Sequence, residues 1–257
     1  MNTIHALILG IVEGVTEFLP ISSTAHLIIA SKILGLKQTE FQKFFEVFIQ
    51  SGAILAVFFV HSKYVLKHKT VIRKIIFSFI PTAIIGLVFY KMIKNYFFTS
   101  DSLIIFTLFF VGAIFLFMEY AISKDKLKLT RSIEHMSHKD ALFIGLIQGF
   151  AVVPGVSRAG IVMVGMMLLR YRRDQAALYS FLLAVPTILA ASGYDFIKSR
   201  NVLVHVPQNI VPLMIGFVTA FISAYLSIRW LMKYLQHNSL SVFGYYRIAL
   251  AIILVVV

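Results

Sequence analysis

Long apolar blocks constrain the fold of this chain more than any other feature of its sequence. Blocks of roughly 20 apolar residues match the hydrocarbon thickness of a lipid bilayer. A soluble domain would need a far more polar surface than a chain with 59% hydrophobic residues and a mean hydropathy of +0.88 can provide. We therefore predict an all-α polytopic membrane protein with a single integral membrane domain over 1–257. Six uninterrupted blocks predict transmembrane helices at about 44–62, 75–95, 102–121, 176–195, 210–233 and 243–257.

The basic residues lie in short loops between these blocks and predict the orientation of the chain. Fifteen Lys and Arg residues lie in four loops, at about 63–74, 122–140, 170–175 and 229–242. The opposite set of loops holds seven, so the first set is predicted to be cytoplasmic and both chain ends external. Membrane anchoring thus accounts for the net charge of +13, and we expect no nucleic-acid partner.

Two further features narrow the class of protein. The first segment lacks a basic start and carries two glutamates, so we do not expect it to be a cleavable signal peptide. Cysteine is absent, which excludes disulfides, thiolate nucleophiles and cysteine-ligated metals.

Two other apolar blocks, about 3–34 and 140–170, are each broken in the middle by proline and by small or polar residues. Irregular backbone cannot face lipid and survives only where protein or a water-filled cavity surrounds it. We expect each block to form a re-entrant helix–break–helix hairpin. The charge distribution predicts that the two hairpins enter from opposite faces of the membrane.

The two broken blocks also predict an internal repeat. "GIVEGVTEFLPISSTAHL" and "GLIQGFAVVPGVSRAGIV" align on Pro20 and Pro154 with an offset of 134 residues. This offset pairs Ser23 with Ser157 and the segment 52–57 with 186–191, whereas pairing Glu13 with Gln148 needs a one-residue gap. We predict two halves of inverted topology, about 1–121 and 135–257, with a site where the broken helices meet.

Glu13 and Glu17 are four residues apart, so they lie on one face of the first half-helix. Two ionised carboxylates that close repel each other, and we expect them to share a proton or to bind a cation. The alternative is a helix near the membrane surface with solvated glutamates. Intramembrane acids are costly and usually functional, which favours the first interpretation.

Both breaks predict helix starts that can bind an anion. Ser22 or Ser23 is positioned as the N-cap of the first restarted helix, and Pro154-Gly155 followed by Ser157 repeats the pattern. A capping serine is common and does not by itself indicate a site. Two half-helix amino ends that converge would, however, offer free N–H groups and partial positive charge to a phosphate.

Two more side chains beside the helix starts are candidates for the chemistry. The planar guanidinium of Arg158 suits phosphoryl oxygens. The alternative is an ion pair with Glu13 or Glu17 that only holds the hairpins together, and both roles can hold in turn. His26 lies three residues after Ser23 on the same helical face, where it could act as a general acid or base or could simply pack and hydrogen-bond.

These motifs resemble those of a known family. "EGVTEFLPISSTAH" together with "PGVSRAG" is similar to the undecaprenyl-diphosphate phosphatases, also called bacitracin-resistance proteins. "FFEVFIQSGAILAV", "YSFLLAVPTILA" and "KYLQHNSLSVFGYYRIAL" extend the resemblance along the whole chain. It implies a multi-pass bacterial inner-membrane enzyme that hydrolyses undecaprenyl diphosphate to undecaprenyl phosphate and inorganic phosphate. It further implies recycling of the lipid carrier for peptidoglycan synthesis, bacitracin resistance and a site facing the periplasm or exterior.

The resemblance also implies which residues form the site. The family's acidic pair, second serine, histidine and arginine fall on Glu13, Glu17, Ser23, His26 and Arg158. It implies a divalent cation, Mg²⁺ or Ca²⁺, at the two glutamates. Residues expected to bind the substrate around this set are Ser22, Thr24, Gly155, Ser157 and Gln148.

The mechanism and the class of function each leave an alternative. Ser23 is the candidate nucleophile, with Glu17 or His26 accepting its proton, but a cation-activated water could attack instead. The rival function is an inverted-repeat secondary transporter or a polyprenyl-phosphate flippase. Arg158 with Ser23 and Ser157 suits a phosphate better than a transported cation. The expected partners are the polyprenyl diphosphate lipid and the bilayer, with a homodimer left open.

Overall fold

A computed structural model describes residues 1–37, 39–92, 100–204 and 210–256. Within these ranges the named elements are all helical, as predicted. They are α1 (Thr3–Thr16), α2 (Ser23–Ile33), α3 (Glu40–Lys67), α4 (Lys69–Met92), α5 (Asp101–Ser123), the 3₁₀ helix η2 (Ile133–His135), α6 (His138–Gly149), the 3₁₀ helix η3 (Phe150–Val152), α7 (Arg158–Leu168), α8 (Arg173–Val204), α9 (Ile210–Leu235) and α10 (Ser241–Val256).

Five of the described helices are long and apolar enough to cross a membrane, namely α3, α4, α5, α8 and α9. The protein is therefore a multi-pass membrane protein. These helices coincide with five of the predicted spans, apart from 93–95, which lies outside the described residues. The sixth predicted span, apart from 257, which lies outside the described residues, falls in α10, an apolar helix of 16 residues that is shorter than a standard crossing. The count of six spans stays a prediction.

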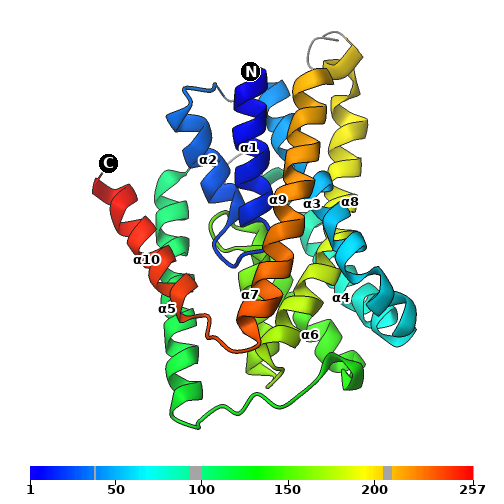
Figure 1. Ribbon diagram of the computed structural model, residues 1–257, viewed down its shortest axis with the longest axis vertical. Coiled ribbons are helices and arrows are strands. Elements are labelled where there is room, and N and C mark those ends of the chain that lie inside the picture. Colours follow the sequence, from blue (N-terminus) through cyan, green and yellow to red (C-terminus); the bar gives the residue numbers. More distant parts are fainter. Residues whose placement is uncertain (38, 93–99, 205–209, 257) are drawn as a thin grey trace.

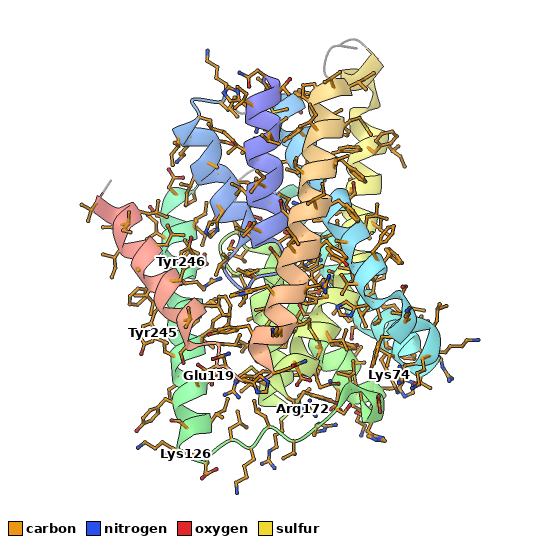
Figure 2. The ribbon with its side chains drawn as sticks, in the orientation of Figure 1. Lys74, Glu119, Lys126, Arg172, Tyr245 and Tyr246 are labelled. Carbon is orange, nitrogen blue, oxygen red and sulfur yellow. The ribbon has the colours of Figure 1, made fainter. Side chains whose placement is uncertain are left out.

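The two broken blocks form interrupted helices at opposite ends of the bundle. Figure 1 shows α1 and α2 in its upper half and α6 and α7 in its lower half. Basic side chains gather at the lower end, where Figure 2 labels Lys74, Lys126 and Arg172. Each interrupted helix enters from its own end of the bundle, and its break lies between the two ends, as the positions of Pro20 and Pro154 predict.

Glycines let each interrupted helix approach a long neighbour closely. α1 packs along α9, and α6 packs along α4. A Cβ at Gly14 would meet the Ala220 carbonyl oxygen of α9, and one at Gly145 would meet the Ser78 carbonyl oxygen of α4. Small residues permit such backbone contact in membrane proteins, where close packing is a main source of helix association.

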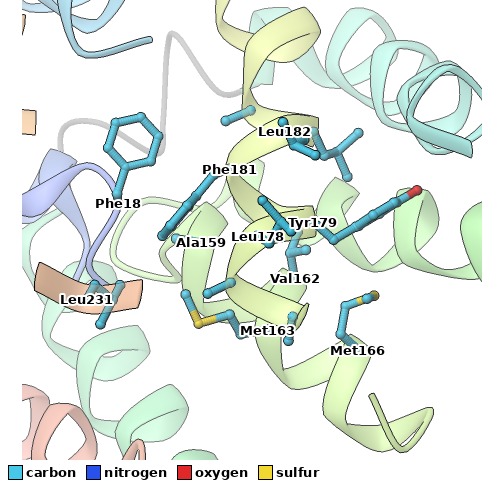
Figure 3. Packing of buried hydrophobic residues seen from close by; sticks show 14 of the residues in the cluster. Phe18, Ala159, Val162, Met163, Met166, Leu178, Tyr179, Phe181, Leu182 and Leu231 are labelled. Atoms are coloured by element: carbon cyan, nitrogen blue, oxygen red, sulfur yellow. The ribbon is translucent and has the colours of Figure 1, made fainter. Parts of the chain in front are cut away.

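The largest buried apolar cluster joins the first break to α7 and α8. The Phe18 ring meets the Phe181 ring edge to face, with ring centroids 5.2 Å apart. Figure 3 shows the Phe181 ring next to Ala159 of α7, with Phe18 on its other side. The residue that follows Glu17 therefore packs against α8, within the same buried cluster as the residues of α7.

A polar cluster at the lower end of the bundle anchors the start of α6. The Asp140 carboxylate accepts hydrogen bonds from Arg131 (2.6 Å) and from the Tyr171 hydroxyl (2.8 Å), and it forms a capping box with Ser137. Partial burial raises the pKa of the Asp140 carboxyl, but hydrogen bonds from Tyr171, Arg131 and Ser137 outweigh it and hold the pKa below its ordinary value. These contacts therefore hold the N-terminus of α6, where the second interrupted helix begins.

Candidate active site

Proline and positive-φ residues create the two breaks. α1 ends at Thr16 with Glu17 as its C-cap, and α2 begins at Ser23. In the other block the chain passes through η3 and Pro154 to Gly155, whose φ of +86° is available to glycine without strain. Proline lacks an N–H group and removes one helical hydrogen bond, but α4 and α8 each continue through an internal proline, so the breaks also need the positive-φ residues. Both helices consequently stop inside the bundle.

Ser22 and Ser157 restart the helices with the same geometry. Their φ angles are +74° and +71°, and their hydroxyl oxygens accept hydrogen bonds from the amides of Ala25 (3.4 Å) and Gly160 (3.1 Å). Ser22, and not Ser23, is therefore the first N-cap. The sequence pairing of Ser23 with Ser157 was wrong by one residue, because the two caps, and not the two prolines, occupy equivalent positions.

Three of the predicted functional side chains meet at these restarts. Arg158, the first residue of α7, donates through Nη2 to Oε1 of Glu17 at 2.7 Å. Ser23, the first residue of α2, donates its hydroxyl to Oε2 of the same carboxylate. The side chains of Arg158 and Glu17 are only 13% and 7% exposed. Groups from the two interrupted helices thus form one largely buried cluster.

Several buried polar atoms next to this cluster have no hydrogen-bond partner in the described part of the chain. They are both carboxylate oxygens of Glu13 and the Nε and Nη1 atoms of Arg158. Glu13 is fully buried, one helical turn before Glu17. Burial of an unpaired carboxylate is costly, so this position suits a proton or a cation. The free guanidinium donors suit an anion.

The described residues contain no group of three or more His, Cys, Asp or Glu side chains that could hold a metal ion. A cation near Glu13 and Glu17 would therefore take its other ligands from water and from a bound substrate. Mg²⁺ commonly binds in this way, through one or two carboxylates and substrate phosphates.

The His26 imidazole contacts α10. One ring nitrogen, Nδ1, lies 2.7 Å from the Ser22 carbonyl oxygen, and Nε2 lies 2.7 Å from the Tyr246 hydroxyl, with the two rings stacked. A neutral ring can donate through Nδ1 and accept at Nε2 in this arrangement. Within the described residues its ring nitrogens bond to Ser22 and Tyr246 and not to Ser23 or Glu17, so this conformation holds His26 beside the cluster.

The remaining predicted residues occupy different surroundings. Thr24 is half-buried in the first turn of α2. Gln148 is buried and donates to the Thr82 and Thr187 hydroxyls at 3.1 and 3.0 Å. The Gly155 carbonyl accepts a hydrogen bond from Arg247 at 2.6 Å.

Sequence reasoning missed Tyr246 and Arg247, which contact predicted site residues from α10. A signal was present, because an arginine within an apolar block is rare and usually functional.

The cap geometry predicts an unusual order of substitutions at Ser157. We expect Ser157→Ala to lower the thermal stability of the detergent-purified protein more than Ser157→Gly does, by about 1 kcal/mol. Alanine loses the cap and keeps the strain of a positive φ, whereas glycine loses only the cap. The control pair is Ser239→Ala and Ser239→Gly, at a loop serine before α10 that does not have a positive φ. There alanine should not be more destabilising than glycine. Equal losses at Ser157, or a greater loss with glycine, would contradict the assigned backbone.

Comparisons with known proteins identify relatives of this chain over nearly its whole length. A family model described as "Bacitracin resistance protein BacA" matches residues 6–253. An undecaprenyl-diphosphatase of Sulfurihydrogenibium sp. (strain YO3AOP1) is 46% identical over 254 residues, covering 98% of each chain. Another, of Aquifex aeolicus (strain VF5), is 42% identical over 253 residues and covers 98% of this chain and 97% of the relative. One from Campylobacter jejuni is 41% identical and covers 98% and 93%.

Proposed function

This chain belongs to the family of bacitracin resistance proteins BacA, and we propose that it hydrolyses undecaprenyl diphosphate at the cluster of Glu17, Ser23 and Arg158. The products are undecaprenyl phosphate and inorganic phosphate. The reaction returns the lipid carrier to cell-wall synthesis and underlies bacitracin resistance. The observation that carries the choice of site is the meeting of Arg158, Glu17 and Ser23 where the two interrupted helices restart.

Charge and position supply most of the catalysis in phosphoryl transfer. The free Nε and Nη1 donors of Arg158 would bind oxygens of the terminal phosphate. The restarts of α2 and α7 add backbone N–H groups and partial positive charge. Buried surroundings strengthen each of these interactions, and little reorganisation is needed when the transition state forms.

Ser23 is the proposed nucleophile. Its hydroxyl already donates to Glu17, so that carboxylate can take the proton while Ser23 Oγ attacks the terminal phosphorus. The bond from phosphorus to the bridging oxygen breaks, and undecaprenyl phosphate leaves with the electron pair. Water then cleaves the phosphoserine, returns a proton to Ser23 and releases phosphate. In the alternative, water attacks directly and Ser23 only orients the phosphate.

A trapped intermediate distinguishes the two routes. We expect acid quenching of the enzyme with terminally labelled substrate to leave phosphate on Ser23, and Ser23→Ala to lose both label and turnover, because Ser23 Oγ forms the bond to phosphorus. Ser51→Ala, which removes a hydroxyl that bonds the Phe48 carbonyl in α3, is the control and should keep both. Persistent turnover in Ser23→Ala would favour direct attack by water.

Phosphate release by detergent-purified protein, without a membrane gradient, tests the function itself. We expect the wild type to release phosphate and Arg158→Lys to be slower by about 10²–10⁴-fold, because an ammonium cannot reproduce the guanidinium fork. Arg229→Lys on α9, whose guanidinium contacts Tyr225, is the matched control and should retain activity. No release by the wild type with any divalent cation would favour a transporter or flippase.

A divalent cation, Mg²⁺ or Ca²⁺, is proposed to bind at Glu13, with Glu17 nearby. The support is the unpaired, fully buried Glu13 carboxylate one turn before the cluster. When bound, such an ion would neutralise charge on the phosphoryl oxygens. The Glu13 carboxylate would hold it, while Glu17 remains the partner of Ser23 and Arg158.

Cation binding can be measured apart from activity. We expect Mg²⁺ to raise the melting temperature of the wild type, because it offsets the buried charge, and to have little effect on that of Glu13→Gln. EDTA should abolish phosphate release. Glu134→Gln, which alters a carboxylate paired with His68 at 3.2 Å, is the control and should respond like the wild type. An equal response in Glu13→Gln would exclude this ligand.

The membrane arrangement is proposed as six spans, with α10 as the sixth, and two re-entrant hairpins related by an inverted repeat. Support comes from the matched caps of Ser22 and Ser157 and from the packing of α1 on α9 and α6 on α4. With the caps aligned, Glu13 lies opposite Gln148 without a gap. Charge bias favours an orientation with the basic end in the cytoplasm. Family membership favours the bacterial inner membrane and a site open to the periplasm or exterior. A homodimer stays a prediction.

A further inference from the structure

Arg247 of α10 is a fully buried arginine that contacts both helix breaks. Its Nη1 atom donates to the Pro20 carbonyl of the first break at 3.3 Å. Its Nη2 atom donates to the Gly155 carbonyl of the second break at 2.6 Å and to the Thr107 carbonyl of α5 at 3.2 Å. One guanidinium therefore joins three segments that are distant in the sequence.

The bonds to Pro20 and Gly155 satisfy backbone carbonyls that the breaks leave without helical partners. A carbonyl outside a helix must find a donor when it is buried in an apolar bundle. Arg247 forms no ion pair with a carboxylate of the described residues, and its guanidinium lies 5.8 Å from the centroid of the Phe115 ring. Its charge is thus matched to carbonyl dipoles, and its planar fork sets the direction of each bond.

The contact points lie close in sequence to the reacting groups. Pro20 is three residues after Glu17 and three before Ser23, and Gly155 is three residues before Arg158. We propose that Arg247 is a positioning residue that fixes the two breaks against each other, so that Ser23, Glu17 and Arg158 meet in reactive geometry. This inference rests on the proposed phosphatase function. A misplacement of about 1 Å in such a site can cost roughly 100-fold in rate.

Arg247→Met and Arg247→Lys in the full-length, detergent-purified protein test the proposal. Methionine removes the charge at similar length, and lysine keeps the charge without the fork. We expect kcat for phosphate release to fall by about 10- to 100-fold in Arg247→Met, with KM within about 3-fold of the wild type. Arg247→Lys should also be slow. The matched control is Arg229→Met, a change at an exposed arginine of α9, and it should keep the wild-type kcat.

A double-mutant cycle separates positioning from stability. If Arg247 acts through the breaks, Arg247→Met combined with Arg158→Lys should lose less activity than the product of the single losses. Independent, multiplied losses would overturn the proposal, as would a folded Arg247→Met with wild-type kcat. A higher KM with unchanged kcat would assign Arg247 to direct substrate binding instead.

Variants that do not fold, and a wild type without activity, also decide whether Arg247 is a positioning residue. If Arg247→Met does not fold, Arg247→Lys carries the test, and wild-type kcat in that variant overturns positioning. If neither variant folds, Arg247 serves stability alone and the proposal fails. A wild type that releases no phosphate would refute the phosphatase function, a result distinct from an active wild type with equally active Arg247 variants.

Discussion

A backbone that leaves its helix inside an apolar bundle must find new hydrogen-bond partners, and this requirement organises the centre of the protein. The Ser22 and Ser157 hydroxyls cap the restarted helices. The Thr107 hydroxyl donates to the Pro154 carbonyl at 2.8 Å, and Arg247 donates to carbonyls of both breaks. The interruptions are therefore held by specific polar contacts with α5 and α10, which makes irregular backbone tolerable there.

The same interruptions bring together the groups of the proposed site. A continuous helix would bond its amides internally, whereas a restarted helix presents free N–H groups and partial positive charge. Arg158 and Ser23 are the first residues of such helices, and Glu17 is the C-cap of α1. A carboxylate, a guanidinium and a hydroxyl can therefore meet within an apolar bundle. Low polarity around them raises the free-energy cost of leaving Glu13 unpaired. It also strengthens the interaction of Glu13 with any ligand that it binds.

How much of this site the sequence could predict depends on how far apart along the chain the contacting residues are. Hydropathy placed five long helices, and the prolines placed both breaks, because these signals act over neighbouring residues. An ion pair of Arg158 with Glu13 or Glu17 could be predicted because a charge in an apolar block needs a partner, but only the structure selects Glu17. The capping serine was uncertain between Ser22 and Ser23, since both have the same chemistry and only the positive φ of Ser22 distinguishes them. The alignment on prolines then shifted the second half by one residue.

The sequence by itself determined the apolar helices, the two interruptions and the set of acid, hydroxyl and guanidinium groups beside them, since all of these follow from local composition and spacing. Only the tertiary structure decided which side chains face one another. His26 turns to Tyr246, 220 residues away, and Arg247 reaches Pro20 and Gly155 from the last helix. The physical reason is that the direction of a side chain depends on the rotation and packing of its whole helix against others. Periodicity within one segment does not contain that information.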